Sequence, residues 1–371
     1  MRISKLELDH FRNYEHLVVD FDRGVNVLLG DNAQGKTNLL ESIYVLALTK
    51  SHRTNNNSDL IQWKQPNSRL KTLVEKNSGN LNLELDLGKK GKRAKVNHIE
   101  QAKLSDYVGQ LNVILFAPED LSIVKGAPQV RRRFMDIEFG QMSNQYLYNT
   151  VQYQRVLKQR NKYLKLLQLH RATDLVYLDV LSDQLAAYGS KVIAQRLMLL
   201  KKLEHWSAEI HSTISQKQEH LTFKYMTSLK QKQLESINAI YDGLKRVFHD
   251  ERDREIKMGT TIAGPHRDDL KFQINQNDVQ TFGSQGQQRT TALSVKLAEI
   301  DLMKSETGEY PVLLLDDVLS ELDDARQTHL LKAIQDKVQT FLTTTSLSGI
   351  AKDLIHDPKV FQVTNGVLKV D

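Results

Sequence analysis

The sequence predicts an α/β fold in which both ends of the chain contribute to a mixed sheet and a mostly helical lobe is inserted between them. Near the N-terminus an apolar strand, a glycine-rich loop and a helix follow one another over residues 25–47. A second apolar strand, residues 312–315, ends in two aspartates about 280 residues after the loop. Between them, residues 131–214 contain almost no glycine or proline and have helical periodicity.

Length and composition indicate a globular chain of two or three lobes. The chain has 371 residues, of which 40% are hydrophobic and 26% are charged. It has no cysteine, which excludes disulfides, thiolate metal sites and a cysteine nucleophile. The apolar runs are far too short to span a bilayer, and residues 1–6 lack the apolar core of a signal peptide. We therefore predict a cytoplasmic protein with no membrane partner.

The glycine-rich loop fits the pattern G-x-x-x-x-G-K-[ST] of a phosphate-binding loop. Glycine lets the backbone curl so that its N–H groups point toward phosphates, and the N-terminus of the following helix adds partial positive charge. In this chemistry Lys36 reaches the β- and γ-phosphates, and the Thr37 hydroxyl binds Mg²⁺. The predicted nucleotide-binding residues of the loop are Gly30, Asp31, Asn32, Ala33, Gln34, Gly35, Lys36 and Thr37.

The strand at residues 312–315 supplies the second half of a nucleoside-triphosphate site. A carboxylate at the carboxyl end of a parallel strand next to the phosphate loop can hold Mg²⁺, and we assign that role to Asp316. The next side chain points to the other face and is placed to polarise the attacking water, a role that we assign to Asp317. Asp317 and Lys36 are thus the predicted catalytic residues.

The separation of these two halves predicts three segments. Residues 1–118 form the first part of an ATPase lobe, residues 119–258 form a helical arm, and residues 259–371 complete the ATPase head. In the arm, residues 131–169 and 174–214 predict a pair of packed helices, and residues 260–263 predict the strand on which the chain returns to the head. We expect the chain to finish in a hairpin whose turn contains an Asn-Gly pair.

Positive charge is distributed unevenly along the chain. The formal net charge is +6, but residues 125–171 contain ten Lys or Arg and only two Asp or Glu. A basic segment of this kind suggests an anionic polymer as a partner, and a solvated helix face explains the same charge equally well. The candidate DNA contacts are the basic hairpin tip with Lys89, Lys90, Lys92 and Arg93, and the run Arg131, Arg132 and Arg133.

Several further motifs resemble those of ABC-type ATPases. Ser284, Gly286 and Gln287 look like the core of the signature motif, and Ser320 and Asp323 lie in a stretch that looks like the D-loop. The strings FRNY, FAPEDL, RRRF and GPHRDD occur in order over nearly the whole chain, beginning at residues 11, 116, 131 and 264. By these strings the chain resembles the RecF family of recombination mediators, whose ABC/SMC-like P-loop ATPase head carries a helical insertion.

The resemblance implies a DNA repair, recombination and replication protein that binds double-stranded DNA and favours gapped junctions. Its partners would be RecR together with RecO, and indirectly RecA, which they help to load. Two copies would form an ATP-dependent homodimer, in which each ATP lies between the phosphate loop of one subunit and Ser284, Gly286 and Gln287 of the other. The resemblance also places Arg12 on a phosphate, although the residue pattern fits a surface arginine equally well.

The chain departs from the ABC pattern in three places. Asp317 stands where most of these enzymes have glutamate, which predicts weak ATP hydrolysis that acts mainly as a switch. The resemblance implies that DNA stimulates this hydrolysis. No histidine follows the strand at residues 340–345, so we expect Thr344 or Thr345 to sense the γ-phosphate. The Q-loop glutamine is absent, and Glu119 is the residue that could replace it.

Three other functions fit parts of the sequence. A transport ATPase would have the Q-loop glutamine, a switch histidine and a much shorter distance from the phosphate loop to the signature. An SMC-like head that serves a nuclease would have a longer coiled coil or an acidic metal cluster after the ATPase. A structural DNA-binding protein that uses ATP only to dimerise would differ mainly in turnover.

Overall fold

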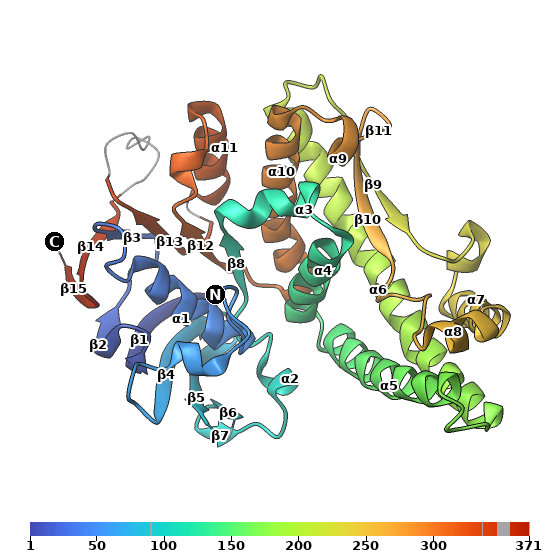
Figure 1. The fold of residues 1–371 in the computed structure, drawn as a ribbon. Helices are drawn as coiled ribbons and strands as arrows, with labels where there is room; N and C mark the ends of the chain where they lie inside the picture. The colour runs from blue at the N-terminus through green and yellow to red at the C-terminus, as the bar shows by residue number, and fades with distance from the viewer. Residues whose placement is uncertain (90, 336, 347–356, 371) are drawn as a thin grey trace. The chain divides into compact units, whose positions relative to one another are not determined.

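The chain divides into two compact units, which are described here for residues 1–89, 91–335, 337–346 and 357–370 of a computed structural model (Figure 1). Unit 1 contains residues 1–121, 213–216 and 292–371. Unit 2 contains residues 122–212 and 217–291. Unit 1 therefore joins the two ends of the chain, and unit 2 is the long insertion.

One sheet of unit 1 joins strands from both ends of the chain. Its order is β15-β14-β3-β13-β12-β8, and every neighbouring pair is parallel except β14 with β15. The strands are β3 (Val25–Leu29), β8 (Val113–Phe116), β12 (Val312–Asp316), β13 (Thr340–Thr344), β14 (Lys359–Thr364) and β15 (Val367–Val370). The predicted mixed sheet is confirmed, and so is the terminal hairpin, because Thr364 pairs with Val367 across the expected turn.

The second sheet of unit 1 is antiparallel, in the order β2-β1-β4-β5-β6-β7. Its strands are β1 (Arg2–Phe11), β2 (Tyr14–Asp20), β4 (Asn67–Lys76), β5 (Gly79–Gly88), β6 (Gly91–Val96) and β7 (Ile99–Glu100). The sequence analysis missed β4. Two of its buried positions are Ser68 and Thr72, so the apolar alternation that indicates a strand is interrupted.

The helix after the phosphate loop, α1 (Lys36–Leu48), contacts strands of both sheets and is buried around most of its circumference. This burial explains why its apolar residues are not confined to one face. The other helices of unit 1 are α2 (Leu104–Tyr107), α11 (Asp324–Ile334) and most of α10 (Gln285–Thr307).

Unit 2 is mostly helical and has one small antiparallel sheet, in the order β11-β10-β9. Its helices are α3 (Leu121–Lys125), α4 (Pro128–Met142), α5 (Asn144–Gln168), α6 (Leu175–Ile214), α7 (Ile237–Asp250), α8 (Arg252–Met258) and α9 (Val279–Phe282). Its strands are β9 (Leu221–Met226), β10 (Asp269–Ile274) and β11 (Asn277–Asp278). The described helices include none with the length and hydropathy that crossing a membrane requires.

The predicted pair of packed helices is present, with one more break than expected. Leu164 and Leu167 of α5 form a buried cluster with Leu178 of α6. The first predicted helix divides at Ser143, whose hydroxyl accepts a hydrogen bond from the N–H of Tyr146 at 3.1 Å and so caps α5.

The predicted strand at residues 260–263 is wrong. The N–H of Thr261 donates to the side chain of Asn161 at 2.8 Å, and the carbonyl of Thr261 accepts from the guanidinium of Arg267. Side chains thus satisfy this backbone, and it pairs with no neighbouring strand among the described residues.

Candidate nucleotide site

The phosphate loop and the aspartates of β12 meet at one edge of the parallel sheet. Strand β13 lies between β3 and β12, and all three run in the same direction, so their carboxyl ends share that edge. The hydroxyls of Thr37 and Thr343 both donate to Oδ1 of Asp316, each at 2.9 Å. The N–H of Asp317 donates to the Thr343 hydroxyl at 2.9 Å. One hydrogen-bonded chain therefore links the start of α1 with the carboxyl ends of β12 and β13.

The threonine of β13 that lines the pocket is Thr343, and the expectation that Thr344 or Thr345 senses the γ-phosphate stays a prediction. The Thr344 hydroxyl donates to the carbonyl of Ser346 at 2.7 Å, and it is Thr343 that lines the pocket. Side chains alternate between the two faces of a strand, so a shift by one residue moves a hydroxyl from one face to the other.

Lys36 begins α1, as predicted, and its ammonium group donates to two carbonyls of its own loop. The acceptors are Gly30 and, at 2.8 Å, Asp31. Burial lowers the pKa of Lys36, and the nearby carboxylates of Asp317, Asp31 and Asp316 oppose that shift. The ammonium group is thus held across the loop, beside the space where phosphate oxygens would lie.

A pocket of about 370 Å³ opens at this edge. Its volume lies within the usual range for small-molecule sites. Ten residues line it: Asn32, Ala33, Gly35, Lys36, Thr37, Asn38, Arg53, Asp316, Asp317 and Thr343. The structure therefore brings most of the predicted loop residues together with both aspartates. Arg53 is a member that the sequence analysis missed, because it lies in a stretch that reads only as a polar loop.

The loop is supported by side chains of the FRNY string, which the sequence analysis did not foresee. The buried Tyr14 hydroxyl donates to the carbonyl of Gly35 at 3.0 Å, and the Asn13 amide donates to the carbonyl of Gln34 at 3.2 Å. Gly35 has φ +117°, and a Cβ there would lie 2.6 Å from the Asn13 amide nitrogen. A larger residue at this position would therefore push the loop away from its support.

Arg12 forms an ion pair with Glu41 in this structure, and its predicted contact with a phosphate stays a prediction. Its guanidinium donates two hydrogen bonds of 2.8 Å to Glu41 of α1, whose side chain is fully buried. Burial raises the pKa of Glu41, but hydrogen bonds from Arg12 and Ser51 outweigh that effect and lower it overall. Arg12 does not line the pocket, whereas Arg53 does, with Nη1 donating to Asn38 Oδ1 at 2.9 Å.

The oxygen atoms at the pocket fit the way in which proteins bind Mg²⁺ together with nucleotide phosphates. This mode uses one or two protein oxygens and leaves the remaining ligand positions to phosphate and water. Thr37 and Asp316 supply a hydroxyl and a carboxylate whose oxygens lie 2.9 Å apart. Within the described part of the chain, no group of three or more His, Cys, Asp or Glu is arranged to hold a metal by itself.

Asp317 and the predicted D-loop lie directly after β12. Asp317 is exposed and has φ +53°, and its carboxylate has no hydrogen-bond partner among the described residues. The Ser320 hydroxyl donates to the Asp317 carbonyl at 2.7 Å, and Asp323 accepts from the N–H of Arg326 at 2.9 Å and caps α11. The Asp317 carboxylate is therefore open to solvent, and the D-loop side chains fix the backbone around it.

The predicted signature residues form a capping box at the start of α10 in unit 2. The N–H of Ser284 donates to the side-chain oxygen of Gln287 at 2.8 Å, and the N–H of Gln287 donates to the Ser284 hydroxyl at 3.2 Å. Gly286 is the second residue of the helix. The Ser284 hydroxyl hydrogen has no acceptor within the described residues, so it can donate to an external group.

The predicted DNA contacts have different environments. Lys89, Arg93 and Arg133 are exposed, and Lys90 lies outside the described residues. Lys92 is half-buried and donates to the Thr49 carbonyl. Arg132 donates to the carbonyl of Asp268 at 2.8 Å, and burial lowers its pKa.

Arg131 is the clearest departure from the predicted DNA contacts. It is 2% exposed, and its guanidinium donates to both carboxylate oxygens of Asp269, at 2.7 and 2.8 Å. Both it and Arg132 therefore hold the backbone of unit 2, and neither is carried forward as a DNA contact.

A different basic surface runs along α5. This helix contains no aspartate or glutamate. Its basic side chains Arg155, Lys158, Lys162 and Lys165 are exposed, and none forms an ion pair with another described residue. Their spacing of three, four and three residues places them on one face of the helix. We call these four residues the α5 stripe. Sequence analysis detected the charge of this segment but not which residues face solvent.

The GPHRDD string at residues 264–269 is held by a network within unit 2. Arg196, whose side chain is 3% exposed, donates to the Pro265 carbonyl at 2.7 Å. The Tyr153 hydroxyl lies 2.6 Å from Nδ1 of His266, and the Tyr225 hydroxyl donates to Asp268 at 2.7 Å. The string thus packs into the interior, where polar groups need partners.

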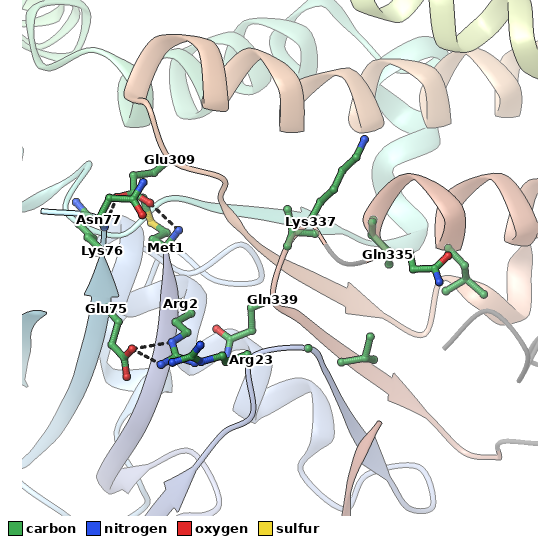
Figure 2. Close-up of a pocket in the computed structure, with 15 residues that line it drawn as sticks. Met1, Arg2, Arg23, Glu75, Lys76, Asn77, Glu309, Gln335, Lys337 and Gln339 are labelled. Atoms are coloured by element: carbon green, nitrogen blue, oxygen red, sulfur yellow. Dashed lines mark hydrogen bonds and ion pairs between the residues drawn. The ribbon is translucent and has the colours of Figure 1, made fainter. Parts of the chain in front are cut away.

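A larger pocket, of about 570 Å³, lies at the opposite edge of the parallel sheet, near the start of β3 and β13 (Figure 2). Its charged groups are partly paired within the pocket. The N-terminal ammonium of Met1 lies 2.9 Å from Glu309, and Arg2 pairs with Glu75. It has no glycine loop and no helix N-terminus, so it does not have the chemistry of a phosphate site.

Comparison with known proteins places the chain in a family. A sequence model described as "RecF/RecN/SMC N terminal domain" matches residues 2–369. A protein of Pediococcus pentosaceus described as "DNA replication and repair protein RecF" is 64% identical, over 99% of this chain and 98% of its own. The chain belongs to the RecF family. A RecF of Enterococcus faecalis is 58% identical over 100% of this chain and 99% of its own.

Solved structures agree with this assignment. A RecF structure described as "the recombination mediator protein RecF-ATP in RecFOR pathway" is 33% identical and has a TM-score of 0.92, covering 100% of this chain and 97% of its own. The Smc head domain of Pyrococcus furiosus is 17% identical with a TM-score of 0.56, covering 100% and 95%. The likeness to RecF therefore extends to the whole fold, and the Smc head shows that the fold is of the SMC-like head type.

Proposed function

We propose that this chain is an ATP-binding DNA repair and replication protein that acts as an ATP-dependent dimer on gapped DNA. The observation that carries the proposal is the convergence of Lys36, Thr37 and Asp316 on one pocket at the carboxyl edge of the sheet. A RecF described with bound ATP is 33% identical over the whole chain, which supports ATP as the ligand.

In this proposal the residues of the pocket have separate roles. Lys36 moves from its loop carbonyls to the phosphate oxygens, which are stronger, charged acceptors. Thr37 and Asp316 hold Mg²⁺, which when bound neutralises phosphate charge. Asp317 has an open carboxylate and accepts a hydrogen bond from the attacking water. Its short side chain positions that water poorly, so hydrolysis is slow and serves to release the protein.

The dimer follows from the separation of the two nucleotide-binding elements on the chain. The phosphate loop belongs to unit 1, and Ser284, Gly286 and Gln287 begin α10 in unit 2. We propose that each ATP lies between the loop of one copy and these three residues of a second copy. A helix N-terminus and a free hydroxyl donor are suited to the γ-phosphate, so hydrolysis removes the contact that joins the copies.

The α5 stripe is the surface that we propose for the DNA backbone, with Lys89, Arg93 and Arg133 as further contacts. Four unpaired cations on one helix face attract phosphates without reading sequence. RecR with RecO, and indirectly RecA, are the proposed partners. The description of a RecF relative within a RecFOR pathway supports them. We place the protein in the cytoplasm, where these partners act.

Fluorescence anisotropy with labelled DNA tests the proposal. Gapped duplex, intact duplex and single strand are titrated with protein in the presence of ATP and Mg²⁺. We expect the gapped duplex to bind most tightly, and the Lys36→Ala variant to lose the effect of ATP. Equal binding with and without ATP would contradict the proposed ATP dependence.

The contribution of the stripe needs a control with the same change in charge. Lys158→Glu with Lys162→Glu reverses two stripe residues, and Lys191→Glu with Lys201→Glu makes the same change on exposed positions of α6. We expect the stripe variant to reduce the slope of log affinity against log salt by about 2, and the α6 variant to leave it nearly unchanged. Equal losses would show that net charge, rather than the stripe, controls binding.

A further inference from the structure

The side chain of Gln287 is held from outside its own helix. Its oxygen accepts from the N–H of Ser284, and its nitrogen donates to Oε1 of Glu219 at 2.8 Å. Glu219 lies between α6 and β9, about 68 residues earlier in the chain. The amide of Gln287 therefore has one fixed orientation, with its oxygen toward the backbone and its nitrogen toward the carboxylate.

Glu219 is itself anchored from the interior of unit 2. Its second oxygen, Oε2, lies 2.8 Å from Nε2 of His211, which is in the last turn of α6 and is fully buried. A carboxylate oxygen can only accept, so Nε2 of His211 carries the hydrogen. Burial lowers the pKa of His211 and outweighs the opposite effect of its hydrogen bond to Glu219. His211 is thus the donor in its contact with Glu219.

We infer that Glu219 is a positioning residue of the signature, which holds Gln287 so that Ser284 presents its hydroxyl to an incoming phosphate, and that His211 anchors Glu219. The capping box and the Glu219 contact together use both ends of the Gln287 amide, so Gln287 cannot turn toward the Ser284 hydroxyl. Support of this kind fixes the geometry of a binding group before the ligand arrives. The inference rests on the proposed function, in which the signature binds the ATP of a second copy.

A carboxylate beside a phosphate site also repels the phosphate, so the two effects of Glu219 oppose each other. Glu219 accepts a hydrogen bond from Gln287, in the third position of α10, whereas Ser284 is the residue proposed to meet the ligand. Repulsion between partly solvated charges falls off with distance, whereas loss of a charge-assisted hydrogen bond releases the side chain at once. We therefore expect positioning to outweigh repulsion.

The test compares Glu219→Gln with Glu209→Gln, which makes the same change of charge on an exposed side chain of α6. Sedimentation velocity with ATP and Mg²⁺ gives the dimer dissociation constant, and a fluorescent ATP analogue at dilute protein gives the affinity of the phosphate loop. We expect Glu219→Gln to weaken dimerisation roughly tenfold and to leave nucleotide affinity unchanged. An unchanged or tighter dimer would overturn the inference.

Variants of His211 distinguish a role in positioning Glu219 from a general loss of folding. His211→Gln keeps a donor that can reach Glu219, so it should retain dimerisation, whereas His211→Leu has no donor and should weaken it. Equal effects of these two variants would contradict the anchor.

A second readout does not depend on the dimer. Hydrogen exchange of residues 284–290 in the free protein should speed up in Glu219→Gln and stay constant in Glu209→Gln, because a freed Gln287 opens the capping box more often. Unchanged exchange would overturn the inference in any case. If the wild type binds ATP but stays monomeric, the proposed dimer fails, and the exchange result still decides whether Glu219 holds this segment.

Discussion

The phosphate loop at residues 30–37 and the GPHRDD string at residues 264–269 are both short, polar stretches that contain glycine and charge. In the loop, polar groups face a pocket, and the hydrogen-bond partners of Lys36 within the described residues are carbonyls of its own loop. In the string, the side chains of His266, Asp268 and Asp269 are bonded to other parts of unit 2, through Tyr153, Tyr225 and Arg131. A distinctive polar string therefore marks a binding site only where its groups remain open to a ligand.

The comparison predicts that a substitution in the hydrogen-bond network around residues 264–269 lowers the free energy of unfolding. Arg196→Met keeps the bulk of the side chain but removes the donor to the Pro265 carbonyl and the ion-pair partner of Asp136. We expect unit 2 to lose about 3 to 5 kcal/mol of stability. Urea unfolding checks this through the fluorescence of Trp206, in a Trp63→Phe background that removes the exposed tryptophan of unit 1. A loss below 1 kcal/mol would show that the network is not structural.

A substitution in the phosphate loop should weaken ATP binding and leave the stability of the protein almost unchanged. Lys36→Ala removes the charged donor to the phosphates, so we expect ATP affinity to fall about 100-fold, or about 2.7 kcal/mol. The melting temperature without nucleotide should stay within about 1 °C, since Lys36 bonds only to its own loop. Calorimetric titration measures the first effect and thermal unfolding the second. Normal ATP affinity would remove Lys36 from the site.

Two glycines with similar backbone angles sharpen the comparison further. Gly264 has φ +111°, and a Cβ there would lie 2.6 Å from the Tyr153 hydroxyl, whereas Gly79 has φ +120° and no atom within 4 Å. We expect Gly79→Ala to cost about 1 kcal/mol for backbone strain and Gly264→Ala about 2 kcal/mol more for the clash. Urea unfolding of both variants checks the difference. Equal costs would mean that the string tolerates displacement.

The smallest expected effect is the dependence of stability on pH through His266. Burial lowers the pKa of His266 to about 4, and repulsion from Arg267 adds to the shift. Histidine in an unfolded chain has a pKa near 6.5, so the unfolded state binds the proton first and stability falls as pH drops from about 6.5 toward 4. At pH 5.5 the loss should be about 1.4 kcal/mol relative to pH 7.5. His266→Gln should lack this component, and an identical pH profile in that variant would contradict the assignment.

The elements that sequence analysis predicted correctly depend on neighbours along the chain. The strand, loop and helix around Lys36 and the apolar strand before Asp316 have patterns that are complete within about ten residues. Their pairing in one sheet could be expected, because two halves of one site must fold together.

The features that sequence analysis did not predict depend on contacts between residues far apart in the chain. The support of the loop by Tyr14 and the place of Thr343 follow from strand pairing that no local pattern encodes. The ion pair of Arg12 with Glu41 likewise joins two residues that lie 29 positions apart in the chain. The wrong strand at residues 260–263 failed because side chains took over its backbone hydrogen bonds.

A mixing experiment tests the central claim, that each ATP is bound by the phosphate loop of one copy and the signature of another. Lys36→Ala retains its signature, and Ser284→Arg retains its loop, so neither variant alone forms a complete site. Mixed in equal amounts with ATP and Mg²⁺, they can form heterodimers with one complete site. We predict that sedimentation velocity shows each variant as a monomer alone and a dimer in the mixture. If the mixture stays monomeric while the wild type dimerises, or if Ser284→Arg dimerises by itself, the two-copy site is contradicted.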